Sequence, residues 1–429
     1  MHFNKILKNT IIWKLLNTVF VFFINILMVR LLGVIDSGIF FYNITILSLL
    51  ILSLSWSLET GITYYTVKEN VAIRSVLHIV IPILMLQSLL TWFIILKIHL
   101  SISNLAAIMF VLGNLCYLYF SALFYAKKWF ILLNTISCIV NFLIILLLLF
   151  NWYFFNNGYI DQQYYTLIYI SAIAFQAVLL VLILVFKPDK NEVRSVILQP
   201  LRKKIFAYST VAFISNIVFF LVTRIDYFFV EKYCSTEALS NYVQVSKFGQ
   251  IVILIPSIIA GMVFPYSANK TDVFSLQNVQ QLCKTISLFF IPFTLVVILT
   301  GSWILPFIFG NGFNLMYKTL LLYLPGFYAL SIISVLAAYL AGKKHLSVNL
   351  IAALIALIIV VIFDFFLIPI WGINAAALIS SVAYAVCGYY IIRFYKIKFD
   401  CDPSTFFSLK KHDLVDILSR LKNLKPVIK

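Results

Sequence analysis

Charged residues are scarce in this chain. Of its 429 residues, 11% are Asp, Glu, Lys or Arg and 63% are hydrophobic, whereas a soluble domain carries roughly 25% charged residues. Apolar runs long enough to cross a bilayer, which takes about 20 residues, recur along the whole sequence. The shortage of charge therefore excludes an ordinary soluble domain and indicates a polytopic membrane protein.

Cysteine is scarce as well, and a nucleotide-binding motif is lacking. Six cysteines are scattered along the chain, several of them inside apolar runs: Cys116, Cys138, Cys234, Cys283, Cys387 and Cys401. None belongs to a C-x-x-C pair, so we expect no disulfide framework, no metal site and no cofactor. The sequence has no P-loop, and direct use of ATP is therefore not expected.

The net charge is nevertheless strongly positive, at +17. Nucleic-acid binding would require a basic face on a soluble module. Most Lys and Arg instead lie between the apolar runs, where the rules of membrane orientation place them. A nucleic-acid partner is therefore not expected.

The apolar runs predict twelve membrane spans. Their approximate limits are 10–32, 39–59, 75–98, 104–126, 129–151, 164–186, 207–230, 242–264, 283–306, 318–341, 346–370 and 373–396. The last two are separated only by "WGI", which with the preceding proline is typical of a tight turn. The first run is too long for a signal peptide and lacks a cleavage site, so it is expected to be retained. The predicted fold class is all-α.

Basic residues lie mainly on one side of these spans. With the N-terminus in the cytoplasm, 26 of the 32 Lys and Arg residues fall in cytoplasmic segments and four in outer segments. Because cytoplasmic loops carry the excess of Lys and Arg, both termini are predicted to lie inside. The outer segments are short, so none of them could hold a large extracytoplasmic active site.

The polar segment 188–204 is the predicted cytoplasmic linker between two similar halves. It separates an N-terminal six-helix bundle, 1–187, from a C-terminal one, 205–396. A basic amphipathic tail, 397–429, is expected to lie on the anionic inner leaflet.

The two halves resemble each other at matched positions. "ALFYAKKWF" (122–130) and "AYLAGKKHL" (338–346) place a Lys-Lys pair between the fourth and fifth helices of each half. The outer loops at 29–43 and 229–243 correspond at an offset of 200 residues. A parallel repeat of two six-helix bundles is typical of transporters, with the substrate path between the halves.

Several motifs resemble those of Wzx-type polysaccharide flippases, in the multidrug/oligosaccharidyl-lipid/polysaccharide exporter superfamily. "RLLGVIDSGIFFYN" resembles the family's first outer loop, although it lacks the usual proline. "DYFFVEKYCSTEALSNYVQVSKF", "LPFIFGNGFNLMYKTLLLYLPGFY" and "LIPIWGINAAALISSVAYAV" resemble its second half, in the expected order.

This resemblance implies a MATE-like, V-shaped cavity that opens alternately to each side of the bacterial inner membrane. It also implies an undecaprenyl-diphosphate-linked oligosaccharide as substrate, destined for O-antigen or capsule. Membrane lipids and other polysaccharide assembly proteins are the implied partners, and no enzymatic reaction is expected.

Three charged residues lie inside predicted spans seven and eight, where a charge is costly and normally faces protein or water. Asp226 and Lys247 lie at similar depth on consecutive helices, which favours an ion pair between them. Arg224 is then left over, and its guanidinium fork suits the phosphates of a lipid-linked diphosphate in a cavity between the halves. Pairing of Arg224 with Asp364 in span eleven is an equally weighted alternative.

At the offset of 200, the corresponding residues of the first half are Ile24, Ile26 and Leu47. The matching helices of the first half thus have no charges at these positions, which indicates that the charges of the second half are not required for folding of the helices. We assign Arg224, Lys247 and Arg30 as candidate substrate contacts and Asp226, Asp364 and Glu59 as candidate acidic residues. Arg30 and Glu59 are expected at span ends, where snorkelling would explain them.

Two other functions compete with a flippase. A cation-coupled drug exporter of the same superfamily would need acidic residues in the cavity, which Asp226 and Asp364 could supply, although the basic excess favours an anionic substrate. An oligosaccharide polymerase or glycosyltransferase would need a larger outer loop or a paired-carboxylate motif, and neither occurs in the sequence.

Overall fold

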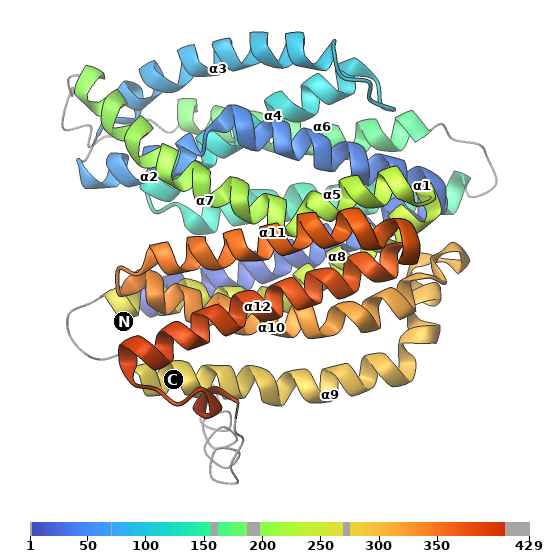
Figure 1. The fold of residues 1–429 in the computed structure, drawn as a ribbon. Coiled ribbons are helices and arrows are strands. Elements are labelled where there is room, and N and C mark those ends of the chain that lie inside the picture. Colours follow the sequence, from blue (N-terminus) through green and yellow to red (C-terminus); the bar gives the residue numbers. More distant parts are fainter. Residues whose placement is uncertain (1, 70, 156–161, 187–197, 269–274, 408–429) are drawn as a thin grey trace, which may run out of the picture. The chain divides into compact units, whose positions relative to one another are not determined.

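A computed structural model describes residues 2–69, 71–155, 162–186, 198–268 and 275–407. These residues form α-helices with two short 3-10 turns and no strand, in agreement with the predicted fold class (Figure 1). The helices are α1 His2–Ser55, α2 Leu58–Lys68, α3 Ile73–Ile95, α4 Asn104–Ala126, α5 Phe130–Phe155, α6 Gln162–Phe186, α7 Leu198–Tyr233, α8 Thr236–Ala268, α9 Leu276–Phe309, α10 Met316–Gly342, α11 Leu346–Trp371 and α12 Ile373–Phe399. The 3-10 turns are η1 Asn311–Phe313 and η2 Pro403–Phe406.

α1 contains two spans separated by a break at Gly33. A straight helix of its 54 residues would be about 80 Å long, far more than the ~30 Å hydrocarbon core of a bilayer. Gly33 has φ 76° and ψ 179°, a conformation that glycine adopts readily because it has no Cβ. Eleven described helices are long and apolar enough to cross a membrane. Counting α1 as two gives the predicted twelve spans.

A second break follows α1 at Trp56 and Ser57, which have φ values of 50° and 51°. The helix then resumes as α2 and continues to Lys68. The predicted second span, 39–59, therefore extends four residues past the end of α1 at Ser55. Glu59 is the second residue of α2, four residues beyond the end of the apolar span at Ser55, so its snorkelling from a span end stays a prediction.

The other predicted spans agree with the observed helices, apart from extensions at their ends. Gly372 ends α11 with φ 60° and ψ −145°, so the tight turn predicted from "WGI" is confirmed. α7 begins at Leu198, and the described part of the predicted linker is thus helical. Residues 188–197 of that linker and 408–429 of the predicted tail lie outside the described residues.

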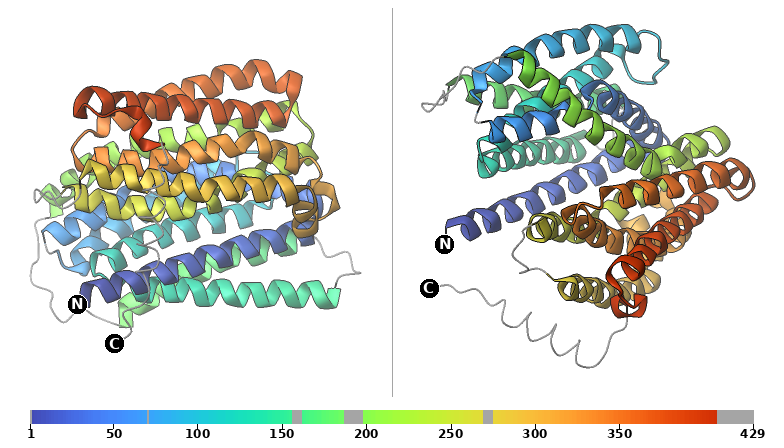
Figure 2. Two further views of the ribbon diagram at one scale, coloured as in Figure 1. Left: turned by 90° about the horizontal axis from the view of Figure 1, so that it is seen from below. Right: turned by 60° about the vertical axis from the view of Figure 1, so that its left-hand side comes forward.

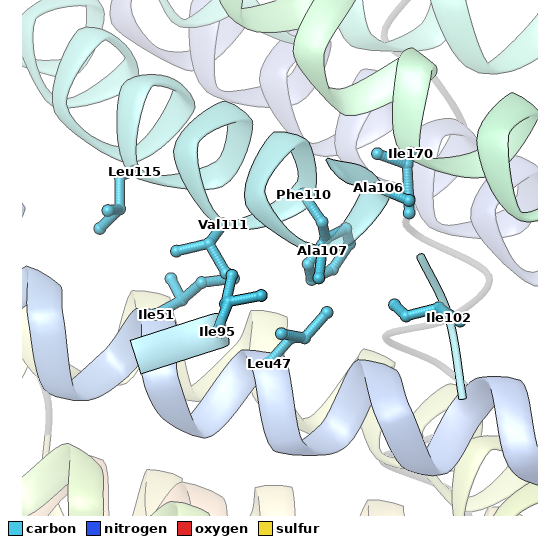
Figure 3. Close-up of a cluster of buried hydrophobic side chains, with 10 residues drawn as sticks. All are labelled: Leu47, Ile51, Ile95, Ile102, Ala106, Ala107, Phe110, Val111, Leu115 and Ile170. Atoms are coloured by element: carbon cyan, nitrogen blue, oxygen red, sulfur yellow. The ribbon is translucent and has the colours of Figure 1, made fainter. Parts of the chain in front are cut away.

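The chain forms two compact units, Met1–Phe220 and Leu221–Lys429, and α7 contributes to both. In the N-terminal unit, α4 packs against α2, α3 and α6, and α1 packs against α5. Figure 3 shows a cluster in which Leu47 and Ile51 of α1 meet Phe110 and Val111 of α4. Because lipid tails are as apolar as these side chains, the cluster stabilises the unit through close van der Waals packing.

The C-terminal unit is organised around α10, which packs against α8, α9 and α12. α11 packs against α12, and these two helices lie alongside each other in Figure 2. After α12, η2 closes on α9 through Gln280, whose side-chain amide donates to Thr405 Oγ1 at 2.9 Å. α12 also packs against α8.

The turns that carry the two Lys-Lys pairs have the same geometry. The second lysine of each pair is left-handed, with φ 60° at Lys128 and 67° at Lys344. The next residue donates its backbone N–H to the carbonyl five residues back, at 2.9 Å from Trp129 and 2.8 Å from His345. This shared geometry, between α4 and α5 and between α10 and α11, supports the predicted parallel repeat.

A close helix crossing is repeated as well. A Cβ added at Gly113 of α4 would lie 3.2 Å from the backbone of Ala174 in α6. A Cβ added at Gly326 of α10 would lie 2.9 Å from the backbone of Ser381 in α12. In each unit the fourth and sixth spans therefore approach each other at a glycine, as small residues allow in membrane proteins.

Candidate functional site

Asp226 lies at the centre of a buried polar cluster in the C-terminal unit. It is on α7, seven residues before the helix ends, and its side chain is fully buried. Its carboxylate accepts hydrogen bonds from the Tyr242 hydroxyl of α8, the Ser380 hydroxyl of α12 at 3.3 Å and the Tyr227 backbone N–H at 2.9 Å. Three helices thus supply the donors that a buried charge requires.

Four buried tyrosines surround this carboxylate: Tyr227, Tyr242, Tyr323 and Tyr384. The rings of Tyr242 and Tyr323 are stacked, with centres 6.0 Å apart, and those of Tyr323 and Tyr384 are 6.3 Å apart. The Tyr384 hydroxyl donates to the Val222 carbonyl of α7 at 3.3 Å. The stacked rings fix the surroundings of Asp226 and limit its contact with water.

A second buried carboxyl group, that of Asp364 on α11, lies within electrostatic reach of Asp226. Asp364 is fully buried, and neither of its oxygens has a hydrogen-bond partner among the described residues. Two neighbouring buried carboxylates are costly when both are ionised and have no cation between them. A proton on one of the two carboxyl groups would remove their mutual repulsion.

Arg224 is half-buried and lies two residues before Asp226. Its Nη1 donates to the Tyr227 hydroxyl and, at 3.4 Å, to Ser246 Oγ of α8. The guanidinium carbon is 4.9 Å from the centre of the Tyr227 ring. All the hydrogen bonds described for this side chain come from Nη1, so its Nε and Nη2 donors can form a fork for a phosphate or carboxylate.

The structure does not form the predicted pair between Arg224 and Asp364, because the Asp364 oxygens accept no hydrogen bond from any described residue. The predicted ion pair between Asp226 and Lys247 is also wrong. The Asp226 carboxylate is occupied by Tyr242, Ser380 and a backbone N–H. Lys247 is at a similar depth, but it lies about 140° around α8 from Tyr242, since a helix has 3.6 residues per turn.

Lys247 is instead near Arg224. It follows Ser246 on α8, is half-buried, and experiences the positive charge of Arg224. An anion beside the two side chains would favour the charged forms of both. The structure thus brings together Arg224, Asp226, Lys247 and Asp364 in one unit.

Arg30 and Glu59, the other predicted site residues, belong to the N-terminal unit. Arg30 is exposed on α1, three residues before Gly33. Glu59 is half-buried, and its Oε2 is buried without a described hydrogen-bond partner. Its charge acts on Tyr119, whose hydroxyl accepts a hydrogen bond from the side-chain amide of Gln87 at 2.7 Å.

The tyrosines and Ser380 were not among the predicted site residues. A signal for one of them exists in the sequence, because Asp226 and Tyr242 are each eight residues from Cys234, in the turn between α7 and α8. Residues equally far from a tight turn between antiparallel helices lie at the same depth. Ser380 has no comparable signal, since α12 is distant in sequence and its rotation depends on packing.

Known structures share this fold over nearly their whole length. The match to the lipid II flippase MurJ, in an inward closed conformation, covers 96% of this chain and 93% of the MurJ chain, with 14% sequence identity and a TM-score of 0.69. The match to the Vibrio cholerae MATE transporter VcmN, in its bent form, covers 94% of this chain and 98% of the VcmN chain, with 13% sequence identity and a TM-score of 0.60. The match to an inward-facing multidrug resistance MATE family transporter of the MOP superfamily covers 95% of this chain and 96% of the transporter chain, with 11% sequence identity and a TM-score of 0.60.

At these identities the structural matches show the fold alone, and they confirm the predicted MATE-like architecture. No curated protein matches the sequence. The family model described as "Polysaccharide biosynthesis protein" matches residues 73–318, which is more than half of the chain. Together with the fold, this match confirms the resemblance seen in the loop motifs, and the chain belongs to the polysaccharide biosynthesis protein family.

Proposed function

We propose that this protein is a flippase that moves an undecaprenyl-diphosphate-linked oligosaccharide from the inner to the outer leaflet of the bacterial inner membrane. The product would serve the assembly of a surface polysaccharide such as O-antigen or capsule. The family match and the transporter fold support this function. The observation that carries the choice of substrate is the half-buried guanidinium of Arg224, whose described hydrogen bonds all come from Nη1.

The diphosphate would bind at Arg224 and at the neighbouring Lys247. Contacts with Tyr227 and Ser246 hold Nη1 of Arg224, which leaves the Nε and Nη2 edge for a bidentate contact with phosphate oxygens. Lys247 would add a second charge on the adjacent helix. Arg30 is proposed as a further substrate contact at the outer end of the first span, on the basis of its charge and position.

The carboxyl pair Asp226 and Asp364 favours coupling of transport to a cation. A proton or a sodium ion between the two groups would remove their mutual repulsion and provide the partner that the Asp364 oxygens lack. The same pair would serve the competing function, a cation-coupled exporter of small molecules. The substrate distinguishes the two proposals, because only the flippase requires a lipid diphosphate.

The orientation belongs to the proposal as well. Both termini would lie in the cytoplasm, the side with most Lys and Arg. Other polysaccharide assembly proteins would supply the lipid-linked oligosaccharide on the inner leaflet and remove it from the outer one. Removal of product, an ion gradient or the membrane potential would then drive transport.

Deletion of the gene tests the proposal in cells. The lipid-linked oligosaccharide should accumulate on the inner leaflet, and expression of the intact protein should clear it. If the lipid-linked pool is unchanged while efflux of small cationic compounds is lost, the exporter is correct and the flippase is not.

A further inference from the structure

Two stacked aromatic pairs join α2, and the break that precedes it at Trp56, to the first half of α7 within the N-terminal unit. The rings of Trp56 and Phe213 are 4.2 Å apart at 15°, and those of Tyr64 and Tyr208 are 4.7 Å apart at 3°. The Trp56 indole N–H also donates to Thr210 Oγ1 at 3.0 Å. We call these four rings the aromatic strip.

Close contacts between the two helices hold the strip in place. A Cβ added at Gly61 would lie 2.4 Å from Ser209 Oγ and 2.8 Å from the Ile205 carbonyl oxygen, so the helices touch at this glycine. At the end of α2, Lys204 Nζ is 2.7 Å from Glu69 Oε1. The rings are thus positioned before any ligand arrives, which lowers the cost of binding one.

The strip is open on one side, and its open side is partly polar. Trp56, Tyr64 and Tyr208 are 40%, 40% and 43% exposed. Asn216, about one turn after Phe213 on α7, is exposed too, and its side-chain amide donates to Ser57 Oγ at 3.0 Å. A polar side chain on a spanning helix is costly when it faces hydrocarbon, so this face suits a hydrated solute.

The exposed face of α3 offers a contrast within the same unit. Its exposed side chains between residues 81 and 93 are all apolar, among them Met85, Leu89, Trp92 and Phe93. Such a face is typical of contact with lipid. The strip differs from it because hydroxyl and amide groups stand beside the aromatic rings.

We propose that the aromatic strip binds the saccharide of the transported lipid, an inference that rests on the proposed flippase function. Sugar rings present an apolar face of C–H groups that stacks on Trp and Tyr, while their hydroxyl groups accept and donate hydrogen bonds at the ring edges. The tyrosine hydroxyls and Asn216 offer such partners. Tyr208 and Phe213 are five residues apart on the continuous helix α7, so the strip extends about 7.5 Å along it at the helical rise.

Binding to two lipids tests the proposal with the full-length protein in nanodiscs. One probe is a polyprenyl diphosphate bearing a hexose trisaccharide, and the other is the same lipid diphosphate without sugar. Trp56→Leu and Tyr64→Leu should each weaken binding of the first probe about tenfold, the factor that corresponds to ~1.4 kcal/mol. Binding of the sugar-free lipid should not change. Trp56→Phe, Tyr64→Phe and the lipid-face control Trp92→Leu should retain the preference for sugar.

Equal losses on both probes, or no loss, would overturn the proposal and leave the strip as a packing element or an interfacial belt. If wild-type protein binds neither lipid, the proposed function itself is wrong.

Hydroxyl-radical footprinting of the unaltered protein provides a second measurement that needs no variant. The sugar-bearing lipid, and not the sugar-free one, should protect Trp56, Tyr64 and Tyr208 from oxidation, with Trp92 unaffected. Equal protection by both lipids would also contradict the proposal.

Discussion

The Tyr242 hydroxyl of α8 donates a hydrogen bond to the Asp226 carboxylate of α7, and this bond joins two helices connected by a tight turn. Arg224, two residues earlier on α7, points about 200° away around the helix axis, because successive residues are rotated by about 100°. One short segment of α7 thus presents its acid to Tyr242 of α8 and Ser380 of α12, and its base to Ser246 of α8. The acidic and basic groups of the site can therefore act on different ligands.

Removing this bond should destabilise the C-terminal unit. Tyr242→Phe leaves a buried carboxylate with one donor fewer, and hydrogen bonds to charged groups contribute about 1.5–3 kcal/mol. We expect a lower thermal-unfolding midpoint in detergent. Tyr153→Phe, on an exposed residue of α5, is the matched control and should have no effect. Equal midpoints for the two variants would show that the Tyr242 bond contributes little.

Neutralising Asp364 should affect coupling more than folding. Its carboxyl group has no described hydrogen-bond partner to lose, so Asp364→Asn should accumulate to wild-type levels. Transport by this variant should lose its dependence on the proton or sodium gradient.

Asp226→Asn should lower both stability and transport, because it weakens three hydrogen bonds. An Asp364→Asn protein that keeps full cation dependence would remove this residue from the coupling site.

The glycine crossing in the C-terminal unit should tolerate no side chain. In Gly326→Ala the new Cβ would meet the backbone of Ser381 at 2.9 Å, so α10 and α12 would have to separate. A loss of folded protein is expected, as measured by size-exclusion chromatography. Gly261→Ala on α8 is the control, because no atom lies within 4 Å of its Cβ. That change should be neutral or stabilising by up to about 1 kcal/mol, since alanine favours helix. Similar yields for the two variants would contradict the crossing.

Single-cysteine labelling should establish the orientation. In a cysteine-free background, Lys128→Cys, Lys203→Cys and Lys344→Cys should be shielded from a membrane-impermeant reagent in intact cells. Asn311→Cys, between α9 and α10, should react. Labelling of position 203 from outside would reverse or refute the proposed topology.

Sequence patterns predicted the helices better than the contacts between them. Apolar length located the spans because a bilayer demands it. The predicted pairing of Asp226 with Lys247 failed because depth along the helix was known and rotation about its axis was not. The break at Trp56 and Ser57 was missed because neither residue is a Gly or Pro, the usual signals of interruption.

Translocation in proteoliposomes is the most direct test of the central claim, that Arg224 binds the diphosphate of a lipid-linked oligosaccharide. Wild-type protein should move such a lipid between leaflets. Arg224→Ala should reduce the rate about 10- to 100-fold, as expected when charge-assisted hydrogen bonds of about 1.5–3 kcal/mol are lost. Arg224→Lys should restore only part of the rate, because an ammonium group lacks the bidentate fork. Since Arg224 does not bind Asp364, the double variant Arg224→Ala with Asp364→Asn should not recover. A wild-type rate for Arg224→Ala, or recovery in the double variant, would contradict the account.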